Sequence, residues 1–194
     1  LDGQTNAGGE DIFVMKYNST GTKQWTKLSG TSGNDQGTAI AVDSSGNIFV
    51  TGWASGSLDG QTAIGSSDIV LLKYLTDGTK VWTRQAGSTS GDWGYGVAVD
   101  NSGNIFVAGY AGGSVDGQSY AGGGTDIVVL KYDSSGTKQW TRIDGSSGPD
   151  QALSIAVDSS GNILVTGYTE GNLDGQTNAG DDDIFLMSFD SSGS

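Results

Sequence analysis

The chain has 194 residues, enough for one sizeable hydrophobic core, and a formal net charge of −13 from 9 basic and 22 acidic residues. Such an acidic chain, which has no basic patch, argues against nucleic acid and against membrane insertion or an anionic membrane surface as partners. The absence of cysteine and histidine excludes disulfides and thiolate metal sites, and it removes the commonest general base and zinc ligand.

The chain is one unit repeated in tandem. The tetrad LDGQ begins at Leu1, Leu58 and Leu173, and its variant VDGQ begins at Val115. Successive copies are therefore 57, 57 and 58 residues apart, a period typical of propellers and other repeat architectures. We expect a single region, 1–194, built of repeats 1–57, 58–114, 115–172 and a partial 173–194. Because Leu1 reads as the middle of a loop, we also expect a piece of a longer protein.

Each repeat predicts four short β-strands. The first is an apolar run, and the second, which follows a glycine turn, alternates polar and apolar residues. The third and fourth are the arms of a hairpin, whose turn carries Asp, Ser and Gly. The first runs lie at 12–17, 69–74, 127–132 and 184–189, the second runs at 23–28, 80–85 and 138–143, and the hairpins at 39–52, 97–109 and 155–167.

Four antiparallel strands per repeat predict an all-β fold, a β-propeller of four-stranded antiparallel blades with about three and a half blades in this chain. A stacked β-solenoid is the alternative, although solenoid coils usually repeat at shorter periods. The small apolar hairpin arm AIAV suits the innermost strand, and the alternating run KQWTKL suits the outer edge. Trp25, Trp82 and Trp140 recur on that outer strand, where we expect them to pack between blades.

The partial blades at both ends of the chain indicate which partners to expect. A closed propeller has about four to eight blades, so three blades and a fragment do not close by themselves. Each terminal blade would then expose an apolar face. We expect further repeats of the same chain or other copies, packed head to tail, to cover these faces, and such contacts close a ring or grow a filament.

The long loops on one face of each blade are the expected place for a binding site, because a rigid scaffold often holds functional residues on loops. The loop after the hairpin carries DGQ and ends in aspartate, and such oxygen-rich loops suit Ca²⁺. The alternative is that these residues only shape turns and cap backbone amides. The candidate calcium ligands are Asp2, Asp11, Asp59, Asp68, Asp116, Asp126, Asp174 and Asp183.

Aromatic residues in the same loops are candidate ligand-binding residues. Trp53, Tyr110 and Tyr168 follow the second hairpin arm, while Trp93 and Tyr95 fall in a predicted loop at 87–96. Exposed rings beside carboxylates can stack on sugars, which makes a glycan the candidate ligand. The alternative is that these rings cover the top of the hydrophobic core.

The repeat also resembles a known family. The pattern AxxIAVDSSGNIFVTG, a Gly/Ser-rich loop, DIFVMKY-x-x-x-G and W-T-x-x-x-G is similar to the bacterial beta-propeller repeat labelled SBBP. The resemblance covers essentially the whole chain and implies a propeller fold in tandem repeats, as found mostly in secreted or surface-anchored proteins of bacteria and some archaea. It implies no shared catalytic residue.

These observations favour a non-enzymatic module at the cell surface or outside the cell, which acts in structure, adhesion or self-assembly. The alternative is a carbohydrate-binding propeller that uses the long-loop face. A carboxylate-dependent glycoside hydrolase ranks third, because repeated aspartates offer identical groups whereas an active site needs distinct roles, and the only glutamates, Glu10 and Glu170, lie in different units.

Overall fold

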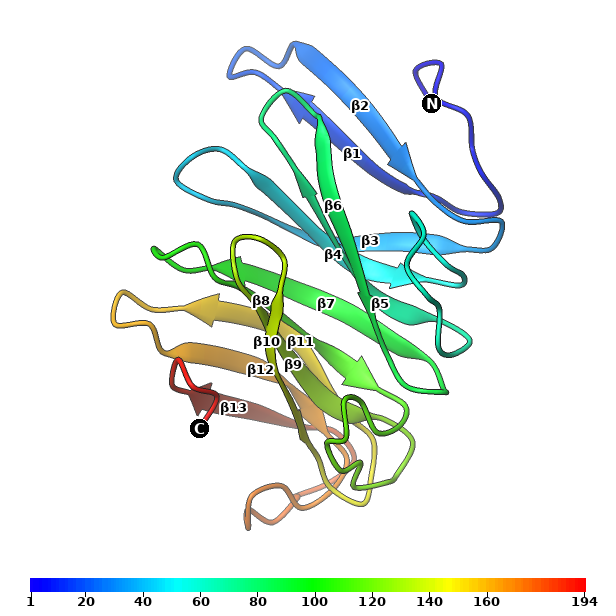
Figure 1. The fold of residues 1–194 in the computed structure, drawn as a ribbon. Helices are drawn as coiled ribbons and strands as arrows, with labels where there is room; N and C mark the ends of the chain where they lie inside the picture. The colour runs from blue at the N-terminus through cyan, green and yellow to red at the C-terminus, as the bar shows by residue number, and fades with distance from the viewer.

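The computed structural model describes residues 1–194 and contains thirteen strands and no helix (Figure 1). The strands are β1 (Ile12–Tyr17), β2 (Lys23–Ser29), β3 (Asp35–Val42), β4 (Ile48–Ala54), β5 (Asp68–Tyr74), β6 (Lys80–Ala86), β7 (Asp92–Val99), β8 (Ile105–Ala111), β9 (Asp126–Tyr132), β10 (Lys138–Asp144), β11 (Asp150–Val157), β12 (Ile163–Thr169) and β13 (Asp183–Phe189). None of the chain forms a helix long and apolar enough to cross a membrane.

The strands form four antiparallel sheets, which lie one after another along the chain in Figure 1. We call them the half-blade (β1-β2), the first full blade (β3-β4-β5-β6), the second full blade (β7-β8-β9-β10) and the C-terminal blade (β11-β12-β13). Strand β7 contacts both β3 and β11, whereas β6 and β10 lie at the outer edges of their sheets. The predicted propeller fold and the predicted order of strands within a blade are confirmed.

Each sheet has two apolar faces because its middle strands are buried on both sides. We call the side that carries Ile69 and Leu71 of β5 the forward face, and the side that carries Val70 and Leu72 the back face. All four side chains are at most 2% exposed. Burial on both faces explains why β5 and β9 read as continuous apolar runs with no alternation.

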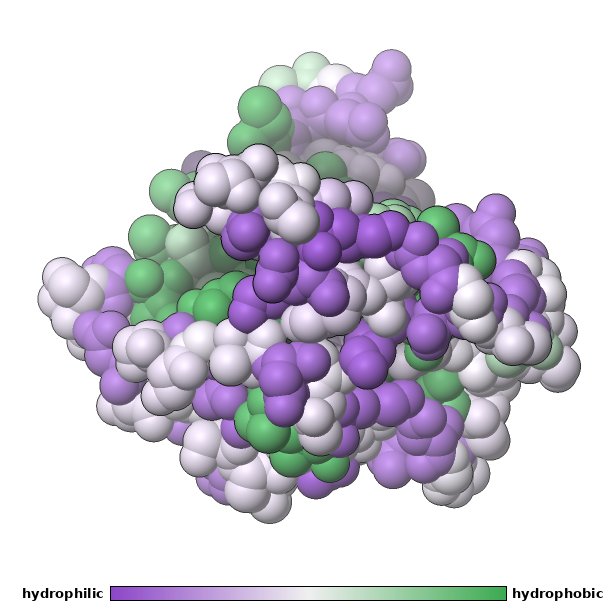
Figure 2. All heavy atoms as spheres, turned by 90° about the horizontal axis from the view of Figure 1, so that it is seen from above, coloured by the Kyte–Doolittle hydropathy of each residue, from purple (hydrophilic) through white to green (hydrophobic).

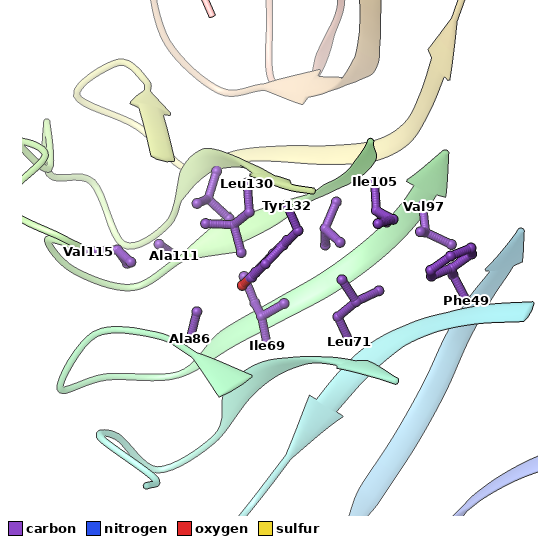
Figure 3. Packing of buried hydrophobic residues seen from close by; sticks show 12 residues of the cluster. Phe49, Ile69, Leu71, Ala86, Val97, Ile105, Ala111, Val115, Leu130 and Tyr132 are labelled. Carbon is purple, nitrogen blue, oxygen red and sulfur yellow. The ribbon is translucent and has the colours of Figure 1, made fainter. Parts of the chain in front are cut away.

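The forward face of one blade packs on the back face of the next. Figure 3 shows this interface between the two full blades, where Ile69 and Leu71 meet Leu130, Tyr132 and their neighbours. An equivalent cluster joins the second full blade to the C-terminal blade, and another joins the half-blade to the first full blade. The hydrophobic core is therefore divided into three interblade layers.

A polar contact at the outer strand accompanies each apolar layer. The Trp82 ring of β6 lies against Gly136 in the turn of the following blade, where a Cβ would come within 2.8 Å of the ring. The Arg84 Nε–H donates to the Gly136 carbonyl at 2.6 Å, and Lys73 Nζ donates to the Ser134 carbonyl at 3.0 Å. The prediction that the recurring tryptophans pack between blades is confirmed.

The inner strands begin earlier than the sequence predicts. They start at Asp35, Asp92 and Asp150, several residues before the apolar runs that mark them in the sequence. Each also contains a bulge, which in β7 leaves Tyr95 as the extra residue between Gly94 and Gly96. The predicted loop at 87–96 is therefore wrong beyond its first five residues, because glycine and aromatic residues here extend the strand.

Candidate functional site

The aspartate of the DGQ turn is tied to the outer strand of its own blade in the three sheets that have one. Asp59 adopts a left-handed backbone with φ of 51° and accepts hydrogen bonds from Lys80 Nζ at 2.6 Å and from the Thr83 hydroxyl. Although burial alone would raise the pKa of Asp59, these two bonds bring it below the usual value. The equivalent ion pairs are Asp2 with Lys23 and Asp116 with Lys138.

The aspartate that opens the third strand of each blade closes the end of the long loop. The Asp68 carboxylate accepts backbone N–H bonds from Ile64 at 2.8 Å and Gly65 at 3.1 Å, together with a bond from Gln85 Nε2 at 3.0 Å. Asp11, Asp126 and Asp183 likewise accept an N–H bond from a residue four or five positions earlier. These contacts hold the loop backbone in place.

A third set of aspartates was missed by the sequence analysis. Asp92 is fully buried at the start of β7, where it accepts bonds from the Ser88 N–H at 2.6 Å and the Gly112 N–H at 3.1 Å. Asp35 and Asp150 occupy the same position in their blades and are also fully buried. Their spacing of 57 and 58 residues is the repeat period, so this signal was available in the sequence.

The eight candidate calcium ligands are not brought together. No group of three or more acidic side chains has the geometry of a metal site, and Asp59 and Asp68 of one loop have separate protein partners. The calcium hypothesis therefore stays a prediction that these contacts do not favour.

Removal of divalent ions tests that hypothesis directly. We expect the melting temperature of the chain to change by less than about 1 °C when EDTA replaces calcium, because the turn aspartates already bind lysine and threonine. Differential scanning calorimetry in matched buffers measures the shift. A rise of several degrees on addition of calcium would instead establish a structural metal.

Asp126 differs from Asp68, its equivalent in the first full blade, because one carboxylate oxygen is unpaired, a feature that it shares with Asp11. Asp126 is fully buried, and its Oδ1 atom has no hydrogen-bond partner. Burial, together with the nearby carboxylates of Asp150 and Asp144, raises the pKa of Asp126 to about 6. In Asp68 the Oδ1 atom accepts the Gly65 N–H and the Oδ2 atom accepts the Gln85 amide, whose position is filled by Ile143 in the second full blade, so Asp126 has fewer donors around it.

The five candidate aromatic residues form one cluster near the inner strands, which we call the axial aromatic cluster. Trp53 lies at the end of β4, Tyr110 and Tyr168 lie at the ends of β8 and β12, and Trp93 and Tyr95 lie on β7. Their placement in loops is therefore wrong. The structure nevertheless brings together residues that are 115 positions apart in the sequence, from Trp53 to Tyr168.

Ring contacts link the cluster across blades. The rings of Trp53 and Trp93 stack with centroids 4.8 Å apart and planes 13° from parallel. Tyr110 lies 5.6 Å from Trp93, and Tyr95 lies 5.9 Å from Tyr110. Burial, and then Tyr168 of the C-terminal blade, raise the pKa of Tyr95. Four of the five rings are partly exposed, and Trp53 is 8% exposed beneath them.

A glycine beside each of the strand-end aromatics allows the inner strand to approach closely. At Gly109, which precedes Tyr110, a Cβ would lie 1.9 Å from the carbonyl oxygen of Trp93. Gly52 and Gly167 stand in the same position, each with a backbone carbonyl 1.8 Å from the Cβ site. The TGW, AGY and TGY motifs therefore combine a backbone requirement with a ring that points forward from the sheet.

The two glutamates do not form a carboxylate pair within one blade. Glu10 accepts a bond from Gln36 Nε2 at 2.6 Å, close to the first full blade, whereas Glu170 follows β12 of the C-terminal blade. A glycoside hydrolase of the usual kind needs two carboxyl groups that flank one bond. The positions of these two residues give no support to that alternative.

Comparisons with known proteins agree with the fold. The chain is similar over 98% of its length to the regulatory protein FlaEY of Caulobacter vibrioides, with 29% identity over 216 residues. It is also similar over 81% of its length to an uncharacterized WD repeat-containing protein of Acanthamoeba polyphaga mimivirus, with 28% identity over 198 residues. The chain spans 23% of the first relative and 14% of the second, so less than a quarter of each.

The SBBP family, described as a beta-propeller repeat, matches the chain three times, at residues 24–59, 81–115 and 139–174. These matches cover more than half of the 194 residues. Each begins in the outer strand of one blade, covers the inner hairpin of the next and ends at the start of the LDGQ or VDGQ tetrad. The chain belongs to the SBBP beta-propeller repeat family.

Proposed function

We propose that this chain is a non-enzymatic structural module that assembles with like blades, head to tail, through two open apolar faces at its ends. The observation that carries the proposal is that these faces are the two unmatched halves of one interblade interface. We place the assembly outside the cell or at the cell surface, where the acidic and cysteine-free composition suits a soluble repeat protein.

The forward face of the C-terminal blade is open. Ile184 is 89% exposed and Leu186 is 74% exposed, whereas Ile127 and Val129, which occupy the same positions in the second full blade, are at most 1% exposed. A hollow of about 390 Å³ lies along β13 and is lined in part by these two side chains. Large exposed apolar patches of this kind mark interaction sites in soluble proteins.

The opposite end of the chain exposes a back face. Phe13 of β1 is 59% exposed and Tyr17 is 53% exposed, although their equivalents Val70 and Tyr74 are at most 1% exposed. Ile40 of β3 is also exposed, and a hollow of about 360 Å³ lies between it and β1. Figure 2, viewed from the end that carries the half-blade, shows apolar residues gathered in a hollow on the surface.

The internal interfaces show what fits each open face. Within the chain, every forward face of the kind that Ile184 and Leu186 form is covered by a back face like that of Phe13 and Tyr17. A second copy can therefore place its half-blade against the C-terminal blade of the first. Such a contact joins different surfaces of the two copies, so it closes a ring or extends a filament.

Particle size as a function of concentration tests the proposal. The wild-type chain is expected to exceed its monomer mass of 19.8 kDa as concentration rises in sedimentation or light scattering. The double variant Ile184→Asp with Leu186→Asp should lower the association constant by at least about tenfold, because each apolar side chain contributes about 1.5–3 kcal/mol on burial.

The control is Ile64→Asp, which introduces one aspartate at a side chain that is 54% exposed in a loop outside both open faces. This variant should associate like the wild type. A wild-type chain that stays monomeric over the whole concentration range, or a control that dissociates as much as the double variant, would overturn the proposal.

A further inference from the structure

The axial aromatic cluster is not needed for the proposed assembly, and the fold does not require all of its rings. The position of Trp93 is filled by Gln36 in the first full blade and by Gln151 in the C-terminal blade. The same fold therefore accepts a polar side chain at this position.

The same holds for Tyr95, whose position is filled by Thr38 and Leu153 in the neighbouring blades. Only the second full blade places two aromatic rings on its inner strand. Propeller packing alone does not explain this concentration, so the rings need a role of their own.

The cluster also contains polar groups with no partner in the protein. Trp53 is 8% exposed, and its indole Nε1–H has no hydrogen-bond acceptor, whereas Trp93 donates its indole N–H to Ser67 Oγ at 2.9 Å. A buried donor without a partner costs about 1–3 kcal/mol, which a ligand oxygen could recover.

The tyrosine hydroxyls add donors and acceptors around this indole. Burial raises the pKa of Tyr95, Tyr110 and Tyr168, so the three hydroxyls stay protonated near neutral pH. The cluster therefore combines partly exposed ring surface with groups that both donate and accept hydrogen bonds, at centroid spacings from 4.8 to 6.3 Å. Flat apolar faces with hydroxyls at their edges are what a sugar ring can stack on.

The charge around the cluster excludes an anionic ligand. Burial, and then Asp182 and Glu170, raise the pKa of Tyr168, which places two carboxylates beside the ring. Glu10 lies on the side of the first full blade, where it binds the side chain of Gln36. With a net charge of −13 on the chain as well, a sulfated or uronic acid polymer would be repelled.

The geometry points to a binding platform for a neutral oligosaccharide on the axial aromatic cluster, formed jointly by the two full blades. Trp93, Tyr95 and Tyr110 supply the stacking surface, and Trp53, whose ring stacks on Trp93, supplies an unpaired indole N–H as a hydrogen-bond donor. The platform does not depend on head-to-tail assembly, because Trp53, Trp93, Tyr95 and Tyr110 lie on β4, β7 and β8 of the two full blades and belong to neither open face.

Nuclear magnetic resonance of the indole N–H signals tests the platform directly. The chain has five tryptophans, and only Trp53 and Trp93 belong to the cluster. Titration with cellohexaose, maltohexaose or chitohexaose should shift these two signals and leave those of Trp25, Trp82 and Trp140 unchanged. Polygalacturonate and choline serve as anionic and cationic probes and should shift none.

Variants that copy the neighbouring repeats keep the test independent of folding. The double variant Trp93→Gln with Tyr95→Thr reproduces the residues at 36 and 38, and it should weaken hexaose binding by about tenfold or more. Tyr95→Thr alone is the fallback if the double variant unfolds. Tyr120→Ser, which removes a partly exposed ring in the loop between β8 and β9, outside the cluster and outside both open faces, should bind like the wild type.

Each result of these titrations either supports or overturns the proposed binding platform. A shift confined to Trp53 and Trp93 with a neutral hexaose, lost in the double variant, supports the platform. The inference is overturned by no shift with any hexaose, by shifts with choline or polygalacturonate alone, or by unchanged affinity in the double variant.

Discussion

Gly109→Ala is expected to destabilise the chain by about 3 kcal/mol or more, the largest effect of any single substitution considered. An added Cβ would lie 1.9 Å from the Trp93 carbonyl oxygen and 2.9 Å from the Gly94 Cα atom. Both obstacles are backbone atoms of the paired inner strand, so no side-chain rotation relieves the clash. Urea denaturation followed by tryptophan fluorescence measures the loss.

A glycine in open space provides the control for this effect. Gly180 has no heavy atom within 4 Å of its Cβ site, and its φ lies in the range that alanine adopts freely. Gly180→Ala should therefore change the free energy of unfolding by no more than about 0.5 kcal/mol. Equal losses from the two substitutions would show that glycine content in general, and not the close approach of strands at Gly109, decides stability.

Asp126→Asn is expected to stabilise the chain by about 1–2 kcal/mol at pH 7, because it removes a buried charge whose Oδ1 has no partner. The asparagine Oδ1 can still accept the Ala121 N–H bond, and its amide can donate toward Asp150, whose charge lies nearby. In a domain of this size the melting temperature should rise by about 2–4 °C for each kcal/mol.

The pH dependence of this gain follows from the direction of the shift. The pKa of Asp126 is raised to about 6 in the folded chain from 3.8, so the folded state binds the extra proton as pH falls through 6. The free energy of unfolding of the wild type should therefore rise, relative to that of Asp126→Asn, as the pH falls from 7 to 5. The stability advantage of the variant should disappear near pH 4. A gain that persists unchanged at pH 4 would contradict this account.

Asp68→Asn is the matched control for that substitution. Both oxygens of Asp68 accept hydrogen bonds, from Ile64, Gly65 and Gln85, and an amide nitrogen cannot accept the bonds it replaces. We expect this variant to lose about 1 kcal/mol at pH 7. Opposite signs at the two equivalent positions would show that the Gly65 and Gln85 donors, which Asp68 has in addition to the Ile64 N–H, decide the cost of the buried carboxylate.

The fold was predictable from the sequence because each blade repeats its apolar runs at a fixed spacing. The periods of 57 and 58 residues place Ile12, Ile69, Ile127 and Ile184 in one register, and burial on both sheet faces makes these runs continuous. The strand order followed from the small residues of AIAV at the crowded centre. The starts of the inner strands were missed because Asp35, Asp92 and Asp150 read as turn residues.

The site was predictable in its residues but not in its arrangement. Four of the five aromatic candidates are linked by ring contacts, yet the stacking of Trp53 on Trp93 joins two blades, and the bulge at Tyr95 interrupts the register of β7. Neither is encoded by a local pattern. The partners of the eight aspartates could not be predicted from the local sequence. Lys80 and Thr83, which donate hydrogen bonds to Asp59, lie 21 and 24 residues further along the chain.

The packing of forward faces on back faces has a consequence for how such a gene can change. Every repeat presents a back face to the preceding blade and a forward face to the following one, and these faces are alike from repeat to repeat. Recombination that inserts or deletes a whole repeat therefore leaves the remaining interblade interfaces intact. The number of repeats can change between lineages while selection on the residues of each interface stays the same.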